Sequence, residues 1–390
     1  MVGSQVFARY IDPKKLAMKI LLFEWLNSGG LWLDGVSPSE DCPIQRQGCQ
    51  MLNAVTEDLL AGGCEVAALV DSRLTGAVVA DKRVTHHEVG ASVDLPAVLL
   101  SLAQNSDAVL VIAPETNSIL SRCLNWLEPV KHKLLNPDAA FTKLASSKSE
   151  LFEYLKAKGF GQFPDGINFQ KFLDQVDPSD RSDWDSAFGL PAVLKPDDGA
   201  GSEEVELITD WASWSQKHSR PNDQYRLESF VPGTAVSVSV LCGGDQCDVL
   251  TPTIQLFDES DADDDADVDA PGGTLGGHYV GAEFPIAKDI SRRAVRLVCE
   301  VLKSLPKTRG YIGMDLVISD SGDRLDDRLI EINPRLTMSY SRLTQIYGSA
   351  ANWGADPSNL PCNLAMQMVQ RALEPATDAP VTCTFREPGL

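Results

Sequence analysis

The stretch GYIGMDLVISDSGDRLDDRLIEINPR, residues 310–335, predicts two β-strands joined by a hairpin loop. Glu331 and Asn333 are two residues apart, so they share one face of their strand, and Asp315 can lie across from them. Two carboxylates and an amide oxygen form a site that suits Mg²⁺ together with substrate phosphates. Arg335 lies two residues further on and suits a phosphoryl or carboxylate group. An edge hairpin with solvated charges would show the same spacing, so both interpretations stay open.

Two weaker features precede this hairpin. Lys195 ends an apolar strand and is followed by PDDGAGS, in which the N–H groups of Gly199, Ala200 and Gly201 can surround a phosphate. This loop matches neither GxxxxGK[ST] nor GxGxxG. The second feature, LESFVPG at residues 227–233, is a strand end that can present a backbone carbonyl and N–H to the edge of an adenine. Taken alone, each feature is better explained by an ordinary turn.

Taken in order, the three features resemble the ATP-grasp superfamily of carboxylate–amine ligases, most sharply at GMDLV and EINPR. The resemblance covers roughly residues 18–345. It implies an α/β protein of the ATP-grasp fold, in which an N-terminal Rossmann-like domain with a parallel sheet precedes two α+β subdomains that clasp ATP. It also implies ATP and Mg²⁺ (or Mn²⁺) as cofactors, and a small carboxylate and a small amine as substrates.

The resemblance also implies roles for individual residues. The expected phosphate-binding residues are the two lysines and the flexible loop: Lys148, Lys195, Gly199, Ala200, Gly201 and Ser202. The expected adenine hinge, with backbone contacts from its second and fourth members, is Glu228, Ser229, Phe230 and Val231. The expected metal ligands are Asp315, Glu331 and Asn333, and the expected catalytic residues are Lys195 and Arg335. One position departs from the family pattern: Ala235 stands where many members have a glutamate that holds the ribose, so ribose contacts come from elsewhere or nucleotide affinity is lower.

Within the superfamily, five strings are most similar to the tyramine–L-glutamate ligases of methanofuran biosynthesis. They are MKILLFEW with its following SGG, VPGTAVSVSVL, HYVGAEFPI, RGYIGMDLV and LIEINPRLTMSY. This likeness implies that L-glutamate is joined to tyramine or a similar amine through an acyl phosphate. Other small amino-acid ligases share most of these strings, so another acid and amine stay open. Glu24, Asn27 and Ser28 lie at the carboxyl end of the first predicted strand, where a parallel sheet places ligands, and we expect them near a substrate amine.

The chain has 390 residues and a net charge of −21, from 34 basic and 55 acidic side chains. This balance argues against a nucleic-acid backbone or an anionic membrane as the main partner. Eight of the acidic residues lie at 258–270, a run that lacks the central Gly and closing Glu of an EF-hand and is typical of a solvated loop. The nine cysteines include no CxxC pair and fit a reducing cytoplasm, and no apolar run of 18 residues could span a membrane. A homodimer is left open.

Alternating strand and helix patterns suggest how the chain is divided. Apolar strands near residues 18–25, 65–71 and 107–115, separated by helical spacing, predict a parallel sheet with crossover helices. The predicted units are a tail at 1–17 (with Met1 or Met18 as the start), an N-terminal α/β domain at 18–125, a central subdomain at 126–222, a C-terminal subdomain at 223–347 and an irregular or partly ordered tail at 348–390.

Two other classes of protein stay open. One is a nucleotide-binding regulatory or scaffold protein with a degraded site, for which Ala235 is the best support. The other is a Rossmann-type oxidoreductase, against which the loop LNSGGLWLDG after the first strand counts because it lacks GxGxxG.

Overall fold

The computed structural model describes residues 18–39, 42–74, 76, 78–176, 184, 186–199, 204–212, 214, 224–257, 279–348, 353 and 363–388. Three of the predicted segments therefore lie wholly outside the described residues. They are the tail at 1–17, the acidic run at 258–270, and the loop members Ala200, Gly201 and Ser202. No helix in the described ranges is both long and apolar enough to cross a lipid bilayer.

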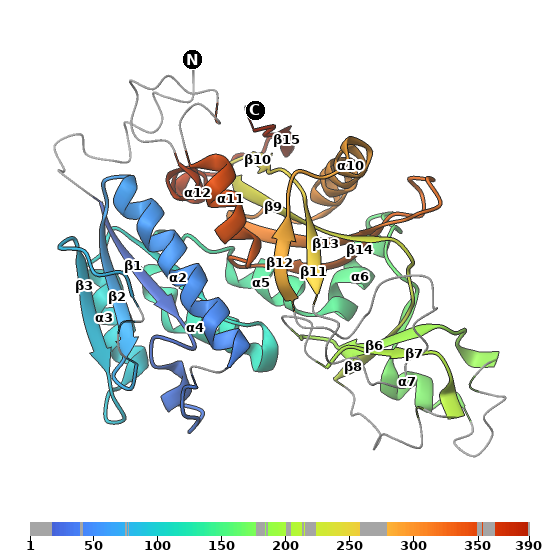
Figure 1. The fold of residues 1–390 in the computed structure, drawn as a ribbon, viewed down its shortest axis with the longest axis horizontal. Helices are drawn as coiled ribbons and strands as arrows, with labels where there is room; N and C mark the ends of the chain where they lie inside the picture. Colours follow the sequence, from blue (N-terminus) through green and yellow to red (C-terminus); the bar gives the residue numbers. More distant parts are fainter. Residues whose placement is uncertain are drawn as a thin grey trace.

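The N-terminal part is a four-stranded sheet with the order β3-β2-β1-β4 and parallel pairing throughout (Figure 1). Its strands are β1 (Lys19–Glu24), β2 (Glu65–Asp71), β3 (Val84–Val89) and β4 (Ala108–Ile112). Its helices are η1 (Gly30–Trp32), α2 (Pro43–Ala61), α3 (Leu95–Gln104), η2 (Thr116–Ser118), α4 (Ile119–Trp126) and η3 (Glu128–Lys133). Alternate residues of β1 are buried on opposite faces, because Leu22 joins the core that contains α2 and Leu21 joins the core that contains α3 and α4. The predicted α/β class is confirmed.

A large mixed sheet follows, with strands in the order β12-β11-β9-β10-β15 and with β13 joining β9 to β14. Its strands are β9 (Thr234–Gly243), β10 (Gln246–Val249), β11 (Thr253–Phe257), β12 (Tyr279–Glu283), β13 (Gly310–Ile318), β14 (Arg328–Asn333) and β15 (Thr382–Phe385). One face packs against three helices, α5 (Ala139–Ser146), α6 (Lys148–Ala157) and α10 (Lys288–Ser304). The other face meets α11 (Ser339–Tyr347) and α12 (Leu364–Leu373).

A third, small antiparallel sheet has the order β5-β8-β6-β7 and stands apart from the other two in Figure 1. It comprises β5 (Gly166–Asn168), β6 (Ala192–Pro196), β7 (Glu206–Ile208) and β8 (Tyr225–Ser229), with α7 (Phe169–Leu173) against it. Its core is rich in aromatic rings, among them Phe169, Phe172 and Trp211, which stack or meet edge to face.

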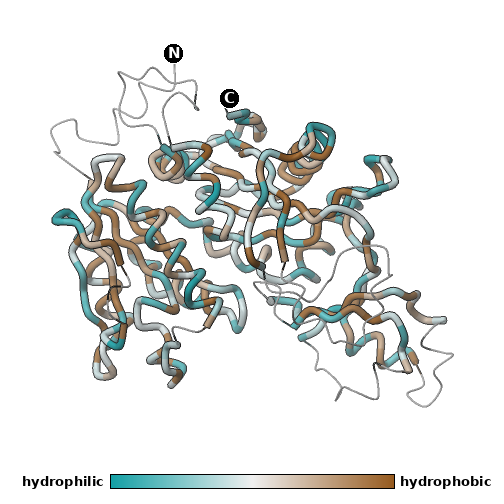
Figure 2. The backbone as a smooth tube through the Cα atoms, in the orientation of Figure 1, coloured by the Kyte–Doolittle hydropathy of each residue, from teal (hydrophilic) through white to brown (hydrophobic). Residues whose placement is uncertain are grey.

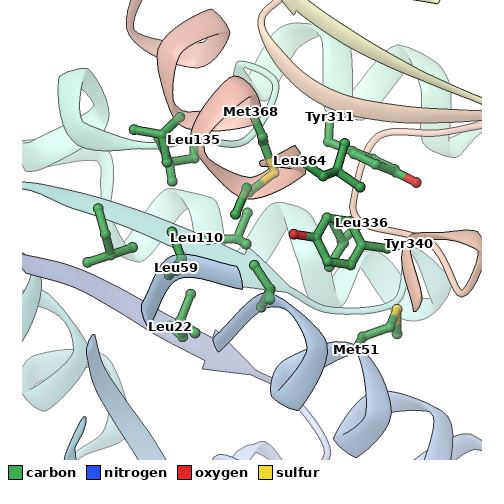
Figure 3. Close-up of a cluster of buried hydrophobic side chains, with 14 of the residues drawn as sticks. Leu22, Met51, Leu59, Leu110, Leu135, Tyr311, Leu336, Tyr340, Leu364 and Met368 are labelled. Carbon is green, nitrogen blue, oxygen red and sulfur yellow. The ribbon is translucent and has the colours of Figure 1, made fainter. Parts of the chain in front are cut away.

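One hydrophobic core joins the N-terminal sheet to the large sheet. Figure 3 shows Leu22 and Leu110 from the parallel sheet close to Leu336 from the segment after β14 and to Leu364 and Met368 from α12. Figure 2 shows hydrophobic segments running through the interior strands of both parts. The two sheets therefore form one packed block, whereas the small sheet has a core of its own.

The tail after residue 347, which we expected to be irregular or partly ordered, contains a helix and a strand within residues 363–388. Leu364 and Met368 of α12 are fully buried against α2 and the large sheet, and β15 extends that sheet beside β10. Asp248 of β10 is fully buried and pairs with Arg371 of α12 at 2.6 Å and with Arg386 after β15 at 2.8 Å. These contacts make the C-terminal segment part of the block.

Candidate active site

The β13–β14 hairpin brings together the three predicted metal ligands. Asp315 and Glu331 are directly opposite each other in the antiparallel register. Asn333 lies on the same face, and its Nδ2 donates to Asp315 Oδ2 at 3.0 Å and to Glu331 Oε1 at 3.3 Å. The two-residue spacing thus produces the face that the sequence predicted.

The two carboxylates have unequal proton affinities. Burial raises the pKa of Asp315 to about 8, and the neighbouring charge of Glu331 adds to the shift. Burial alone would also raise the pKa of Glu331, but the charges of Lys148 and Lys195 outweigh it and lower that pKa to about 2. Two close carboxylates together with an amide form an oxygen donor set that fits Mg²⁺ or Mn²⁺, and such a cation would remove the repulsion that raises the pKa of Asp315.

Lys148 stands between this donor set and the phosphate loop. It is the first residue of α6, whose N-terminus is capped by the Ser147 hydroxyl, which accepts from Glu150 N at 3.1 Å. Its buried Nζ lies 3.1 Å from Glu331 Oε2 and donates to Gly199 O at 3.1 Å. One cation therefore touches both a predicted metal ligand and the only predicted loop glycine within the described residues.

Lys195 is held by a buried acidic residue of the neighbouring strand. Its Nζ lies 2.6 Å from Glu228 Oε2, and the other carboxylate oxygen pairs with Arg226 Nε at 2.7 Å. Both carboxylate oxygens of Glu228 are therefore paired with basic side chains. In the predicted hinge, only the backbone of Glu228 could still contact an adenine. Arg226 is a neighbour that the sequence did not indicate.

Some backbone N–H groups of the predicted hinge already form hydrogen bonds within the protein. Ser229 N–H donates to Asp165 O at 2.8 Å, so its carbonyl is the group left to meet a ligand. Phe230 N–H donates to Pro191 O at 3.1 Å. Val231 lines the cavity that is described next. Its N–H donates to no backbone carbonyl of the described turns and loops. A carbonyl at Ser229 and an N–H at Val231 form the donor–acceptor pair that an adenine edge requires.

A first cavity lies between the small sheet and the hairpin. Its apolar walls come from both sheets, with Val193 on one side and Leu316 and Ile330 on the other. The predicted site residues that line it are Lys148, Lys195, Gly199, Glu228, Ser229, Val231, Asp315 and Glu331. Ala235 lines it too, so the position that departs from the family pattern faces the same space.

A second cavity lies between the N-terminal sheet and the large sheet, and Asp315 and Glu331 line both cavities. Arg335 lines the second one, where its Nε donates to Glu115 Oε2 at 2.8 Å. Glu115 follows β4 and is 4% exposed, so the N-terminal part fixes the orientation of the predicted catalytic arginine. Glu115 could have been found from its position as the polar residue that follows an apolar strand, whereas no pattern in the sequence indicates its partner.

Of the three residues expected near a substrate amine, one reaches this second cavity. Glu24 lines it, whereas Asn27 holds Glu24 by donating to its Oε2 from the backbone N at 2.8 Å and from Nδ2 at 2.6 Å. The hydroxyl of Ser28 accepts from the backbone N of Glu24 at 3.2 Å. Asn27 and Ser28 therefore position Glu24.

We expect the stability of the metal-free protein to fall as the pH rises from about 5.5 to 8.5. Asp315 has a pKa raised to about 8, so the folded state keeps a proton that the unfolded chain has lost, and this contribution disappears as the pH rises. Glu24 and Asp58, with pKa values raised to about 7 and about 6, act in the same direction. Thermal unfolding at a series of pH values measures the slope.

Mg²⁺ binds the deprotonated carboxylates, so the rise in Tm that it produces should be larger at pH 8.5 than at pH 5.5. Asp315→Asn should abolish most of this response, while Asp320→Asn, at an exposed position on the same hairpin, should retain it. A metal response that is independent of pH would contradict the assignment of Asp315 as a ligand.

Comparisons with known proteins give two family-model matches and a curated relative. The family model of the ATP-grasp domain matches residues 145–339, half of the chain, and that of the pre ATP-grasp 3 domain matches residues 64–140. Tyramine–L-glutamate ligase of Methanocaldococcus jannaschii is 22% identical over 250 residues, which are 64% of this chain and 60% of that protein. The match thus spans less than two thirds of this relative.

Solved structures share the fold at low identity. An ATP-grasp superfamily protein from Archaeoglobus fulgidus superposes with a TM-score of 0.56 at 19% identity, covering 85% of both chains. The L-amino acid ligase from Bacillus licheniformis gives 0.61 at 14% identity, covering 93% of this chain and 75% of that one. The biotin carboxylase domain of Hydrogenobacter thermophilus 2-oxoglutarate carboxylase, solved with MgADP, gives 0.58 at 12% identity, covering 94% and 72%. Because a family model accounts for half of the chain and the fold agrees with it, this chain belongs to the ATP-grasp family.

Proposed function

We propose that the protein is an ATP-dependent carboxylate–amine ligase that works through an acyl phosphate. The observation that carries this proposal is the position of Asp315 and Glu331, which line both cavities. The first cavity suits a nucleotide and the second suits the substrates, so the two carboxylates stand where the γ-phosphate and a substrate carboxylate would meet. A site for nucleotide binding alone would not need this connection.

The reaction has two steps in this proposal. The substrate carboxylate attacks the γ-phosphorus to give an acyl phosphate and ADP, and the amine then displaces phosphate to give the amide. Lys148 and Lys195 hold the phosphates, and Arg335 stabilises the acyl phosphate from the side of the second cavity. Mg²⁺ or Mn²⁺, bound by Asp315, Glu331 and Asn333, would neutralise charge on the transferred phosphoryl group. The remaining contribution is to position the two substrates, since no covalent bond to the protein is required.

For the substrates, we propose L-glutamate and tyramine or a similar small amine, as in methanofuran biosynthesis. The relative from Methanocaldococcus jannaschii supports this choice. The second cavity supports it too, because its walls include Ile44, Met51, Ile112 and Ile119, which can pack against an aromatic or aliphatic body. Another acid and amine of the same chemical class would use the same walls.

A panel of acids and amines, assayed for ADP and phosphate release with MgATP, tests the proposal. We expect release only when L-glutamate and an aromatic amine are both present, together with one amide product identified by mass. Equal release of ADP and phosphate with unrelated amino acids would contradict the choice of L-glutamate and tyramine, but it would still support a ligase. Control reactions, from which the acid, the amine or MgATP is left out in turn, give the background rate of release.

One observation favours a second candidate, a nucleotide-binding regulatory protein. Ala235 lines the first cavity where many relatives hold the ribose with a glutamate. Tight ATP binding without ADP formation across the whole panel would favour this candidate over the ligase.

A further inference from the structure

The second cavity contains an acidic side chain that the phosphoryl chemistry does not use. Glu24, the last residue of β1, is 2% exposed and lines the cavity. Among the ion pairs of the described part of the chain, none involves Glu24, whereas Glu331, Glu228 and Glu115 are each paired with a basic side chain. A buried carboxylate without a cation is costly unless a ligand supplies one.

The orientation of this carboxylate is fixed. Asn27 donates twice to Oε2, from its backbone N at 2.8 Å and from Nδ2 at 2.6 Å. Both hydrogen bonds go to one oxygen and leave Oε1 on the side of Gly48, which also lines the cavity. The carboxylate is therefore held rigidly with one oxygen available to a ligand.

Gly48 lets the Glu24 carboxylate pack closely against helix α2. It lies within that helix, where alanine would be the more favourable residue. A Cβ added at this position would lie 2.5 Å from Glu24 Oε1, which is too close for any real contact. A side chain at residue 48 would therefore push the carboxylate out of its present position.

The charges around the cavity also favour a cation. The ionisable carboxylates and the basic group that line it are Glu24, Asp315, Glu331 and Arg335. Arg335 is already paired with Glu115, and Glu331 with Lys148. Burial raises the pKa of Glu24 to about 7, against the hydrogen bonds from Asn27, so a cation placed beside it would restore its ionised form. Asp315 and Glu331 are the carboxylates proposed to bind metal ions. Glu24 is then the carboxylate of this cavity that could pair with a further positive charge.

We propose that Glu24 binds the primary ammonium group of a substrate, with Asn27 orienting the carboxylate and Gly48 leaving room for that carboxylate beside helix α2. This inference rests on the proposed ligase function and names one recognition element of its substrate cavity. Leu26, Ile44 and Met51 line the same cavity, so the ammonium group would be carried on an apolar body. Two sources share this chemistry: the α-ammonium of the amino acid that is activated, and the ammonium form of the acceptor amine.

The hydroxamate assay separates these sources. Wild-type protein, MgATP, L-glutamate and hydroxylamine should give glutamyl hydroxamate, because hydroxylamine, which is mostly uncharged at about pH 8, traps the acyl phosphate. Glutarate has the same carboxylates without the ammonium group, so the ratio of kcat/KM for glutamate to that for glutarate measures recognition of the ammonium. Tyramine in place of hydroxylamine measures recognition of the acceptor.

Glu24→Gln keeps the size of the side chain and removes its charge. We expect the KM for one ammonium-bearing substrate to rise by about 10- to 100-fold, the scale of a lost charged hydrogen bond, with the rate recovered at saturating substrate. Loss of the glutamate-to-glutarate preference assigns the site to the acid, whereas a higher KM for tyramine alone assigns it to the acceptor. An unchanged KM for both substrates in an active variant overturns this inference and leaves the ligase intact, while a wild-type protein that forms no hydroxamate overturns both.

Gly48→Ala offers a second variant that retains the charge of Glu24. Its methyl group should raise the same KM by displacing the Glu24 carboxylate, although alanine favours the helix. Gly161→Ala is the matched control, because a Cβ there meets no atom within 4 Å, and it should behave as wild type. A KM for Gly48→Ala equal to that of this control would count against the proposed site.

Discussion

Replacing Glu331 by glutamine is expected to lower the turnover of ATP-dependent amide formation by about 100- to 1,000-fold, the scale measured when one electrostatic group is lost from a transition state. Glu331 is opposite Asp315 in the hairpin and pairs with Lys148 at 3.1 Å. The substitution therefore removes a proposed metal ligand and, at the same time, the partner of a lysine that we propose to bind phosphate. Phosphate release at saturating ATP, Mg²⁺ and both substrates measures the effect.

The control for this substitution is Glu300→Gln, which changes a partly exposed glutamate of α10 whose partner is Arg296 on the same helix. We expect turnover within about twofold of wild type, because Glu300 lines neither cavity. The stability should also change little, since exposed ion pairs of this kind contribute little to it. Circular dichroism of both variants should match wild type, because glutamine fills the same volume. Near-normal turnover in Glu331→Gln would remove Glu331 from the metal site.

The hairpin geometry was predictable because it depends on local rules. A period of two residues puts Glu331 and Asn333 on one face, and antiparallel pairing of two adjacent strands places Asp315 across from them. The buried parallel strands were predictable for a similar reason, since continuous apolar runs between helical patterns indicate a sheet covered on both faces. Each of these inferences needs only a short window of sequence.

The partners of the charged residues could not be predicted in this way. Glu115 and Arg335 are 220 residues apart in the chain, and no periodic pattern relates them. The same holds for Asn117, whose N–H donates to Asp198 Oδ2 across 81 residues. Such pairs depend on how the sheets are placed against one another, which a single sequence does not specify.

The helix of the C-terminal segment was not predicted, for a different reason. Leu364 and Met368 have the four-residue spacing of a helix, but proline-rich flanks made the segment look irregular. Its helix is stabilised by burial against α2 and the large sheet, so tertiary packing decided its structure. The edge strand β3, whose sequence VTHHEV is polar, escaped prediction because only its pairing with β2 identifies it.

Replacing Arg335 by methionine is expected to have two effects that a further substitution can separate. Turnover should fall by about 100-fold or more, because the cation proposed to stabilise the acyl phosphate is lost. Stability should also fall by about 3–5 kcal/mol, since Glu115 is left buried and unpaired. Glu115 is 4% exposed, and its Oε1 already has no hydrogen-bond partner among the described residues. Urea unfolding and phosphate release measure the two effects independently.

The double variant Glu115→Gln/Arg335→Met distinguishes a catalytic arginine from a structural one. Glutamine at residue 115 carries no charge, so removing both members of the pair should recover most of the lost stability, as replacement of a whole buried ion pair often does. Turnover should remain as low as in Arg335→Met, because the guanidinium group is still absent. If turnover instead recovered together with stability, Arg335 would serve only to join the large sheet to the N-terminal sheet through Glu115, and the acyl phosphate would have to be stabilised by Lys148 and Lys195 alone.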